Sequence, residues 1–252
     1  MVSLVPAAGS RIAVAGGCGG MGRVFVRAAL ELGLRVAVLD LPRSLEEFPV
    51  PDGVLDVACD ATSEDAVTAA FAAVGREWGA LDALVNFVGF TNERRTIEAM
   101  PLGEWNEIIT GSLTSAFLLA HAAIPLLRNG TSPSIVSTSS TFGVTVSMPG
   151  FGPYAVAKAG IINLTRVLAR ELGPGIRVNA IAPGITQTAF LDGGTGREAK
   201  AEKTNTQAIA NVVPLKRIAQ PEDMVGPILF LIGPGAAYVN AQTLHVNGGH
   251  WS

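Results

Sequence analysis

Short apolar runs alternate along the chain with longer stretches in which apolar residues recur at helical spacing. The short runs are continuously apolar, which is typical of strands buried on both faces of a parallel sheet. The runs expected to be strands are 11–15, 35–39, 54–58, 81–86, 134–140, 176–183 and 242–246, and the expected helices are 21–33, 62–78, 103–127, 153–173 and 221–232. This order predicts an α/β fold, a doubly wound parallel sheet of about seven strands flanked by helices, in a single domain over residues 1–252.

Residues at the ends of these stretches support the helix assignments. Gly33 follows the first helical stretch and suits a helix C-terminus. The sequence Thr62-Ser63-Glu64-Asp65 has the pattern of a helix N-cap, and Pro221 suits the first turn of the last helix. The chain shows no internal repeat and no linker, so we expect no second domain.

Composition narrows the classes of function. Hydrophobic residues make up 48% of the 252 residues and charged residues 15%, which is ample for a large core. A net charge of −3 and a pI near 5.6 argue against a nucleic-acid partner or an anionic membrane surface. Two cysteines cannot form a disulfide framework, the first residues lack the features of a signal peptide, and charged residues interrupt every long apolar run. We therefore expect a soluble cytoplasmic protein, and the three scattered histidines predict no metal site.

A glycine-rich segment, AVAGGCGGMG over residues 13–22, lies between the first expected strand and the first expected helix. Its spacing is Gly16-x-x-x-Gly20-x-Gly22. The free N–H groups at a helix N-terminus suit a pyrophosphate, and glycines let phosphates approach the backbone closely. A plain tight turn with a packing glycine is the alternative interpretation of this segment alone.

Asp40 lies at the end of the second expected strand, eighteen residues after Gly22. A carboxylate at this position can accept hydrogen bonds from adenosine ribose hydroxyls and would repel a 2′-phosphate. Taken by itself it could be a solvated turn residue before Pro42, and Arg43 adds a nearby positive charge. Together with the glycine segment, Asp40 favours NAD(H) over NADP(H).

Tyr154 and Lys158 are four residues apart near the start of an expected helix and therefore share one face. A nearby ammonium group favours the phenolate form of tyrosine, which can then exchange a proton with an alcohol or carbonyl oxygen. Ser140, at the end of the fifth expected strand, could hold the same oxygen. Each feature alone is common, but the carboxyl ends of parallel strands are where such folds bind ligands.

In the order and spacing of these motifs the chain resembles the short-chain dehydrogenase/reductase family over essentially its whole length. The family's loop T-G-x-x-x-G-x-G matches residues 15–22, with Ala15 in place of threonine, and its N-x-x-x-P-G-x-x-x-T element matches residues 179–188. The resemblance implies a Rossmann-type fold. It also implies that the residues in contact with NAD(H) are Gly16, Cys18, Gly19, Gly20, Met21, Gly22, Asp40, Leu41, Asp60, Ala61, Asn86, Val88, Gly89, Tyr154, Lys158, Pro183, Gly184, Ile185 and Thr188.

The resemblance also implies a catalytic centre of Ser140, Tyr154 and Lys158. Ser140 is preferred to Ser139 because Gly143 then falls where the family's S-S-x-x-G has its glycine. An asparagine of the family's proton relay aligns with Ser112, which is shorter and offers fewer hydrogen bonds. The family's N-N-A-G is Asn-Phe-Val-Gly at residues 86–89, so only its two ends are kept.

The expected function is NAD-dependent interconversion of a secondary alcohol and a ketone, with Tyr154 as the general acid and base. A lid over the substrate is expected at 189–212, and the expected substrate-pocket residues are Phe142, Phe151 and Phe190. The alternatives are a 3-oxoacyl-thioester reductase and a catalytically impaired protein that senses NAD. By resemblance, the protein is expected to be a homotetramer or a homodimer.

Overall fold

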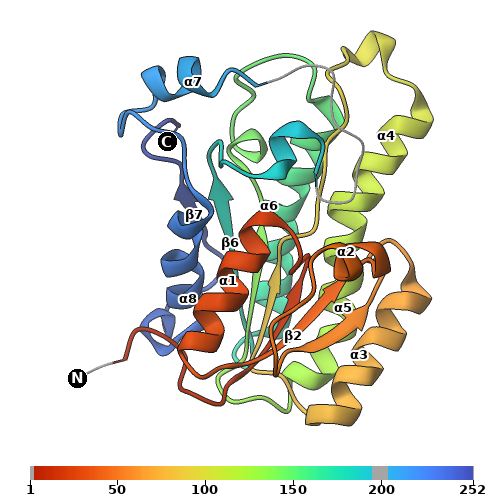
Figure 1. Ribbon diagram of the computed structural model, residues 1–252, viewed down its shortest axis with the longest axis vertical. Coiled ribbons are helices and arrows are strands. Elements are labelled where there is room, and N and C mark those ends of the chain that lie inside the picture. The colour runs from red at the N-terminus through yellow and green to blue at the C-terminus, as the bar shows by residue number, and fades with distance from the viewer. Residues whose placement is uncertain (1–2, 195–203, 252) are drawn as a thin grey trace.

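The computed structural model describes residues 3–194 and 204–251 and contains a seven-stranded parallel sheet (Figure 1). The strand order is β3-β2-β1-β4-β5-β6-β7. The strands are β1 (Arg11–Ala15), β2 (Arg35–Asp40), β3 (Leu55–Ala58), β4 (Ala83–Asn86), β5 (Ser134–Thr138), β6 (Arg177–Pro183) and β7 (Thr243–Val246). All seven expected strands are present, and the doubly wound α/β fold is confirmed.

Helices cover both faces of the sheet because alternate residues of each central strand point to opposite sides. On one face, Ala13 and Ala15 of β1 belong to a core cluster shared with helices α3, α5 and α6; on the other, Ile12 and Val14 belong to a cluster shared with α1 and α8. Figure 1 shows these two helix layers around the sheet. The helices are α1 (Gly20–Glu31), α2 (Pro42–Glu47), α3 (Glu64–Trp78), α4 (Leu102–Ile109), α5 (Ser115–Leu127), α6 (Gly152–Leu172), α7 (Thr206–Val212) and α8 (Val225–Ile232).

The capping residues fulfil their expected roles. The Ser63 side chain accepts a hydrogen bond from the Ala66 N–H at 3.3 Å, which fixes the start of α3. Gly33 has a φ of +72° directly after the end of α1, a left-handed conformation that glycine adopts without strain. The last expected helix begins with a 3-10 turn, Pro221–Met224, before α8.

The stretch 103–127, expected to be one regular helix, is interrupted. A π-helical turn, Thr110–Thr114, separates α4 from α5. By length and composition the continuous stretch Leu102–Leu127 could cross a membrane, but half of its most apolar window is buried inside the fold. This continuous stretch therefore packs in the core of the fold. Its π-helical turn is an irregularity of the kind that often accompanies functional sites.

Two other local expectations are corrected. The fifth strand ends at Thr138 instead of residue 140, and α2 was not expected because Pro42–Glu47 has no long apolar pattern. Within the expected lid, 189–212, the structure has a 3-10 turn (Ala189–Asp192) and α7; the remainder at 195–203 lies outside the described residues. Because the chain order reverses between β1 and β4, a crevice is expected at the carboxyl ends of these two strands.

Candidate active site

Two connected cavities lie along the carboxyl edge of the sheet. The larger, which we call the cleft, has a volume of about 590 Å³ and extends from Asp40 and Asp60 to Gly89. The smaller, which we call the pocket, has a volume of about 150 Å³ and contains Tyr154 and Lys158 on its wall. The residues that line both cavities, and so mark their junction, are Met21, Phe87, Gly89, Thr188 and Phe190.

The glycine segment forms the floor of the cleft at the N-terminus of α1. Gly16 has a φ of +75°, and a Cβ at Gly22 would overlap the carbonyl oxygen of Gly16. A Cβ at Gly20 would lie 2.8 Å from the Cβ of Thr188. Gly19 is the N-cap of α1, and within the described part of the chain no side chain caps this helix start. The exposed N–H groups and the close backbone therefore fit a dinucleotide pyrophosphate.

Asp40 forms part of the cleft wall and also holds the glycine segment in place. Its Oδ2 accepts a hydrogen bond from the Cys18 N–H at 2.8 Å, and its Oδ1 accepts one from the Leu41 N–H at 2.8 Å. Each carboxylate oxygen keeps further lone-pair capacity for a ribose hydroxyl. Burial, followed by the charge of Asp40, raises the pKa of the Cys18 thiol to about 12, so this thiol stays protonated and unreactive.

The outer part of the cleft is lined by Asp60 and Ala61, which the resemblance assigns to the adenine end. Asp60 Oδ1 accepts hydrogen bonds from the Thr62 N–H at 2.9 Å and the Thr62 hydroxyl at 2.6 Å. These bonds fix the turn between β3 and α3. The adenine-end residues are thus held by their own loop.

The loop after β4 connects the cleft to the pocket. Asn86 Oδ1 accepts a hydrogen bond from the Val88 N–H at 2.8 Å, which shapes this loop. Gly89 has a φ of +153°, and a Cβ there would lie 2.9 Å from Lys158 Nζ and 3.5 Å from Ser112 Oγ. The lysine and the serine therefore approach the same glycine, and this close approach explains why glycine occupies position 89.

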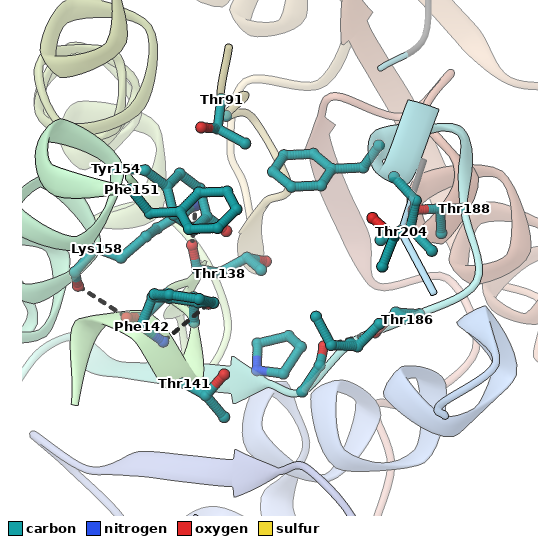
Figure 2. Close-up of a pocket in the computed structure, with 18 of the residues that line it drawn as sticks. Thr91, Thr138, Thr141, Phe142, Phe151, Tyr154, Lys158, Thr186, Thr188 and Thr204 are labelled. Carbon is teal, nitrogen blue, oxygen red and sulfur yellow. Dashed lines mark hydrogen bonds between the residues drawn. The ribbon is translucent and has the colours of Figure 1, made fainter. Parts of the chain in front are cut away.

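The three expected catalytic side chains meet in the pocket. Tyr154, 8% exposed, and Lys158, 3% exposed, lie on α6, and Ser140 begins the 3-10 turn that follows β5. The Tyr154 and Ser140 side chains are hydrogen-bonded to each other, and Ser140 Oγ also accepts the Phe142 N–H at 3.2 Å. Ser139, by contrast, donates its hydroxyl to the Lys158 carbonyl at 2.8 Å (Figure 2). This difference favours Ser140 over Ser139 as the group that faces a substrate oxygen.

Burial dominates the protonation equilibria of this group. It raises the pKa of Tyr154 to about 12, with the Ser140 hydrogen bond acting in the opposite direction. It lowers the pKa of Lys158 to about 8. Lys158 Nζ donates to the Thr138 carbonyl at 2.8 Å and lies 5.6 Å from the centre of the Tyr154 ring. The lowering of the phenol pKa that we expected from the ammonium group is not among the causes of this shift; desolvation, opposed by the Ser140 hydrogen bond, sets its direction in this structure.

Ser112 lies in the π-helical turn and is fully buried. Its hydroxyl donates to the Phe90 carbonyl at 3.4 Å. The turn brings Ser112 close to Gly89, which Lys158 Nζ also approaches, and the resemblance puts a proton relay at this position. No periodicity in TGSLTSAF distinguishes this turn from regular helix, so the irregularity could not be predicted.

The expected substrate residues surround Tyr154. The ring centres of Phe142 and Phe151 are 4.9 Å apart, and those of Phe142 and Phe190 lie 6.3 Å and 5.7 Å from the Tyr154 ring. Residues that sequence reasoning missed include Thr91, Thr138, Thr141, Thr186 and Thr204, which also line the pocket. They come from loops and strand ends far apart in the sequence, and no local pattern marks them.

The segment after β6 supplies the remaining expected contacts. Pro183, Gly184, Ile185 and Thr188 line the pocket. Asn179, the first residue of the matching element, is turned away: its side chain donates to the Val239 carbonyl at 2.9 Å and accepts the Gln242 N–H at 3.0 Å. Among the described residues no group of three or more metal-ligating side chains is placed to hold a metal ion.

Comparison with known proteins supports the same family. The enoyl-(acyl carrier protein) reductase family matches residues 16–250. The 3-oxoacyl-(acyl-carrier-protein) reductase FabG of Vibrio cholerae is 31% identical over 240 residues, which cover 94% of this chain and 95% of that protein.

Two solved structures from Brucella melitensis superpose over nearly the whole chain. One is a short-chain dehydrogenase/reductase described as a glucose/ribitol dehydrogenase, with a TM-score of 0.88, 27% identity and 100% coverage of both chains. The other is a 3-ketoacyl-(acyl-carrier-protein) reductase complexed with NADH, with a TM-score of 0.86, 25% identity and coverage of 98% of this chain and 99% of that chain. The chain therefore belongs to the short-chain dehydrogenase/reductase family of oxidoreductases.

Proposed function

We propose that the protein is an NAD(H)-dependent oxidoreductase that interconverts a secondary alcohol and a ketone. The observation that carries this proposal is the Tyr154 hydroxyl, which is hydrogen-bonded to Ser140 and lies beside a buried lysine on the wall of the pocket. When bound, the nicotinamide supplies the acceptor or donor of hydride at the substrate carbon. The whole chain then acts as one catalytic domain.

In this proposal each side chain has one task at the reacting oxygen. During oxidation Tyr154, as phenolate, takes the hydroxyl proton while the carbon loses its hydride, which leaves a neutral ketone. Ser140 holds the oxygen in place by a hydrogen bond. Lys158 carries the positive charge that favours the phenolate, and Ser112 passes the proton onward from the lysine.

NAD(H) is proposed over NADP(H) because of Asp40. Its carboxylate lines the cleft at the end of β2, where a 2′-phosphate would meet a negative charge. Asp60, Leu41 and Ala61 would surround the adenosine, and Gly19, Gly20 and Met21 the pyrophosphate. The NADH complex of the Brucella reductase supports a nicotinamide cofactor in this cleft.

The test is a combination of binding and turnover. NADH and NADPH are titrated against the protein by fluorescence, and ketones are then screened for oxidation of the tighter-binding cofactor. We expect NADH to bind at least about 10-fold more tightly, since a desolvated like-charge contact costs about 1.4 kcal/mol or more. Equal affinities would refute the cofactor assignment, and cofactor binding without turnover would favour the NAD-sensing alternative.

A second candidate reaction is reduction of a 3-oxoacyl thioester, because the FabG relative carries that name. The same Ser140, Tyr154 and Lys158 would act on the 3-oxo group. Acetoacetyl-coenzyme A is the discriminating substrate. A kcat/KM for it well above that for simple ketones would make thioester reduction the main activity.

The proposal includes a lid and an oligomer. Residues 189–212 would close over the substrate, with Phe190 already next to the Tyr154 ring.

Phe117 on α5 and Val156 and Val167 on α6 are large apolar side chains exposed on the surface. These helices are proposed to pair in a homodimer or homotetramer, and light scattering at micromolar concentration that gives a monomer would contradict this.

A further inference from the structure

Arg23 is the fourth residue of α1 and directly follows the last glycine of the glycine segment. A positive charge at this position is unfavourable by itself, because the N-terminus of a helix already carries positive partial charge. The side chain is half-buried, and among the residues that the structure describes it forms no ion pair. Contacts other than a charge pair therefore keep the guanidinium group here.

The guanidinium group folds back onto the turn that precedes the helix. Arg23 Nη1 donates a hydrogen bond to the Cys18 carbonyl at 2.7 Å. Cys18 is part of the turn that the Gly19 N–H closes on the Gly16 carbonyl at 3.1 Å. A hydrogen bond from a charged donor is stronger than one between neutral groups. The side chain of α1 thus holds the turn from which the helix itself starts.

Cys18 is held from a second direction by Asp40. Its N–H donates to Asp40 Oδ2 at 2.8 Å, while its carbonyl accepts from Arg23. Both polar backbone groups of this residue are therefore bonded to side chains of other elements, one on β2 and one on α1. Cys18 is only 2% exposed and is not among the described residues that line the cleft or the pocket. It forms a fixed layer behind the glycines that face the cleft.

Phe48 completes this arrangement directly after the end of α2. The central carbon of the Arg23 guanidinium group lies 4.0 Å from the centre of the Phe48 ring. The Phe48 carbonyl also accepts a weak hydrogen bond from Cys18 Sγ at 3.7 Å. A planar guanidinium group on an aromatic face is stabilised by stacking and by its charge. Since α1 and α2 follow the neighbouring strands β1 and β2 (Figure 1), Arg23 connects the segment after Asp40 to the glycine segment.

From these contacts we infer that Arg23 is a positioning residue for the dinucleotide. Together with Phe48 it fixes Cys18 between Asp40 and the start of α1, and so sets where the carboxylate lies relative to the first N–H groups of the helix. The inference rests on the proposed function and adds to it a residue that determines the affinity for the adenosine diphosphate half of the cofactor. Arg23 is not among the described residues that line either cavity, so it acts through Cys18.

The experiment measures the dissociation constants of ADP-ribose and NADH by calorimetry for the native protein and four variants. Arg23→Met keeps a long apolar stem but removes the charge and the donor. Arg23→Lys restores a charge and a donor without the planar group, and Phe48→Leu removes the ring. Arg27→Met is the matched control, because Arg27 is an exposed residue one turn further along α1 that donates to the Arg23 carbonyl at 3.4 Å and not to the glycine segment.

We expect Arg23→Met to bind both ligands about 10-fold more weakly, because one charge-assisted hydrogen bond is lost and the Cys18 carbonyl keeps no donor in its place. Arg23→Lys should recover most of this affinity, Phe48→Leu should lose part of it, and Arg27→Met should bind like the native protein. With any ketone that the native enzyme reduces, the KM for NADH should rise in Arg23→Met while kcat at saturating NADH is unchanged, because the pocket is not altered.

Native affinity for ADP-ribose in Arg23→Met would overturn the inference even if its melting temperature fell, because the contacts would then support the fold alone. An equal loss of affinity in Arg27→Met would also overturn it, since removal of any positive charge from α1 would then have the same effect. Failure of the proposed function has a different signature: a native protein that binds neither ADP-ribose nor NADH has no dinucleotide site for Arg23 to position.

Discussion

The cleft around the glycine segment and the pocket around Tyr154 lie at the same sheet edge but are built from different parts of the chain. In the cleft the binding groups are largely backbone N–H groups exposed by glycines. The carboxylates there accept two hydrogen bonds each, Asp40 from the Cys18 and Leu41 N–H groups and Asp60 from Thr62 in its own loop. In the pocket the working groups are side chains, and Lys158 and Tyr154 are almost completely buried.

This difference separates the parts that hold the fold from the parts that serve the chemistry. Removal of a cleft carboxylate leaves backbone donors without their acceptors, so it disturbs structure and binding together. The pocket instead contains the desolvated ammonium group of Lys158, and the buried Thr138 Oγ1 at its edge has no hydrogen-bond partner among the described residues. Such groups reduce stability and are retained for function. Each prediction below tests one side of this contrast.

The largest effect is expected for a substitution in the pocket, at Tyr154, and it is an effect on the turnover number. Tyr154→Phe removes one oxygen and keeps the ring that packs against Phe142 and Phe190. We expect kcat to fall by about 100-fold to 10,000-fold, which is typical of the loss of a general acid or base, with NADH affinity unchanged. Tyr238→Phe is the control, because the chain has only these two tyrosines and Tyr238 is fully exposed. Full activity in Tyr154→Phe would refute its role.

The next effect is expected in the cleft, on both binding and stability. In Gly22→Ala the new Cβ would overlap the Gly16 carbonyl oxygen, so the glycine segment must shift. We expect NADH affinity to fall by more than about 10-fold and the melting temperature to fall by several degrees. In Gly226→Ala the new Cβ meets no atom within 4 Å, so this helical variant should equal or exceed the native stability. Tight NADH binding in Gly22→Ala would show that the loop is more adaptable than its geometry indicates.

A smaller effect is expected for Asp40, with two components. Asp40→Ala removes the charge that opposes a 2′-phosphate and also the acceptor for the Cys18 and Leu41 N–H groups. NADH binding should weaken by about 10-fold, and the preference for NADH over NADPH should narrow. Asp56→Asn on the exposed edge of β3 is the control for loss of charge. If NADPH came to bind as tightly as NADH does to the native protein, the anchoring role of Asp40 would be negligible.

The same contrast explains how much of the molecule could be predicted from the sequence. The strands, the glycine segment and Asp40 follow local rules of spacing and strand-end position, and the structure has them where they were expected. The threonines that line the pocket could not be predicted, because they come from loops, from the ends of several strands and, at Thr204, from the segment just before α7. The π-helical turn at Ser112 and the burial that raises the pKa of Tyr154 depend on tertiary packing, which leaves no periodic signal.

The smallest effect is expected for a substitution of Lys158, and it is an effect on the stability of the folded protein. Burial lowers the pKa of Lys158 from 10.5 to about 8, so the folded protein at neutral pH holds an ammonium group at a penalty on the order of 3 kcal/mol. Lys158→Met removes this penalty but leaves the Thr138 carbonyl without its donor, which returns about 1–3 kcal/mol. The net gain should be small, a rise in melting temperature of about 2–4 °C at pH 7, while turnover is lost.

The pH dependence of that gain identifies its cause. Between about pH 8 and 10.5 the unfolded chain keeps a proton on Lys158 that the folded chain releases, so native stability rises with pH relative to the variant. Tyr154 acts in the opposite direction only above pH 10, since its folded pKa is raised to about 12, and it does so equally in both proteins. The advantage of Lys158→Met over the native protein should therefore shrink between pH 8 and 10, as measured by thermal unfolding, whereas Lys216→Met, at an exposed lysine, should show no such trend. A constant difference across this range would mean that packing, not the buried charge, sets the stability of the pocket.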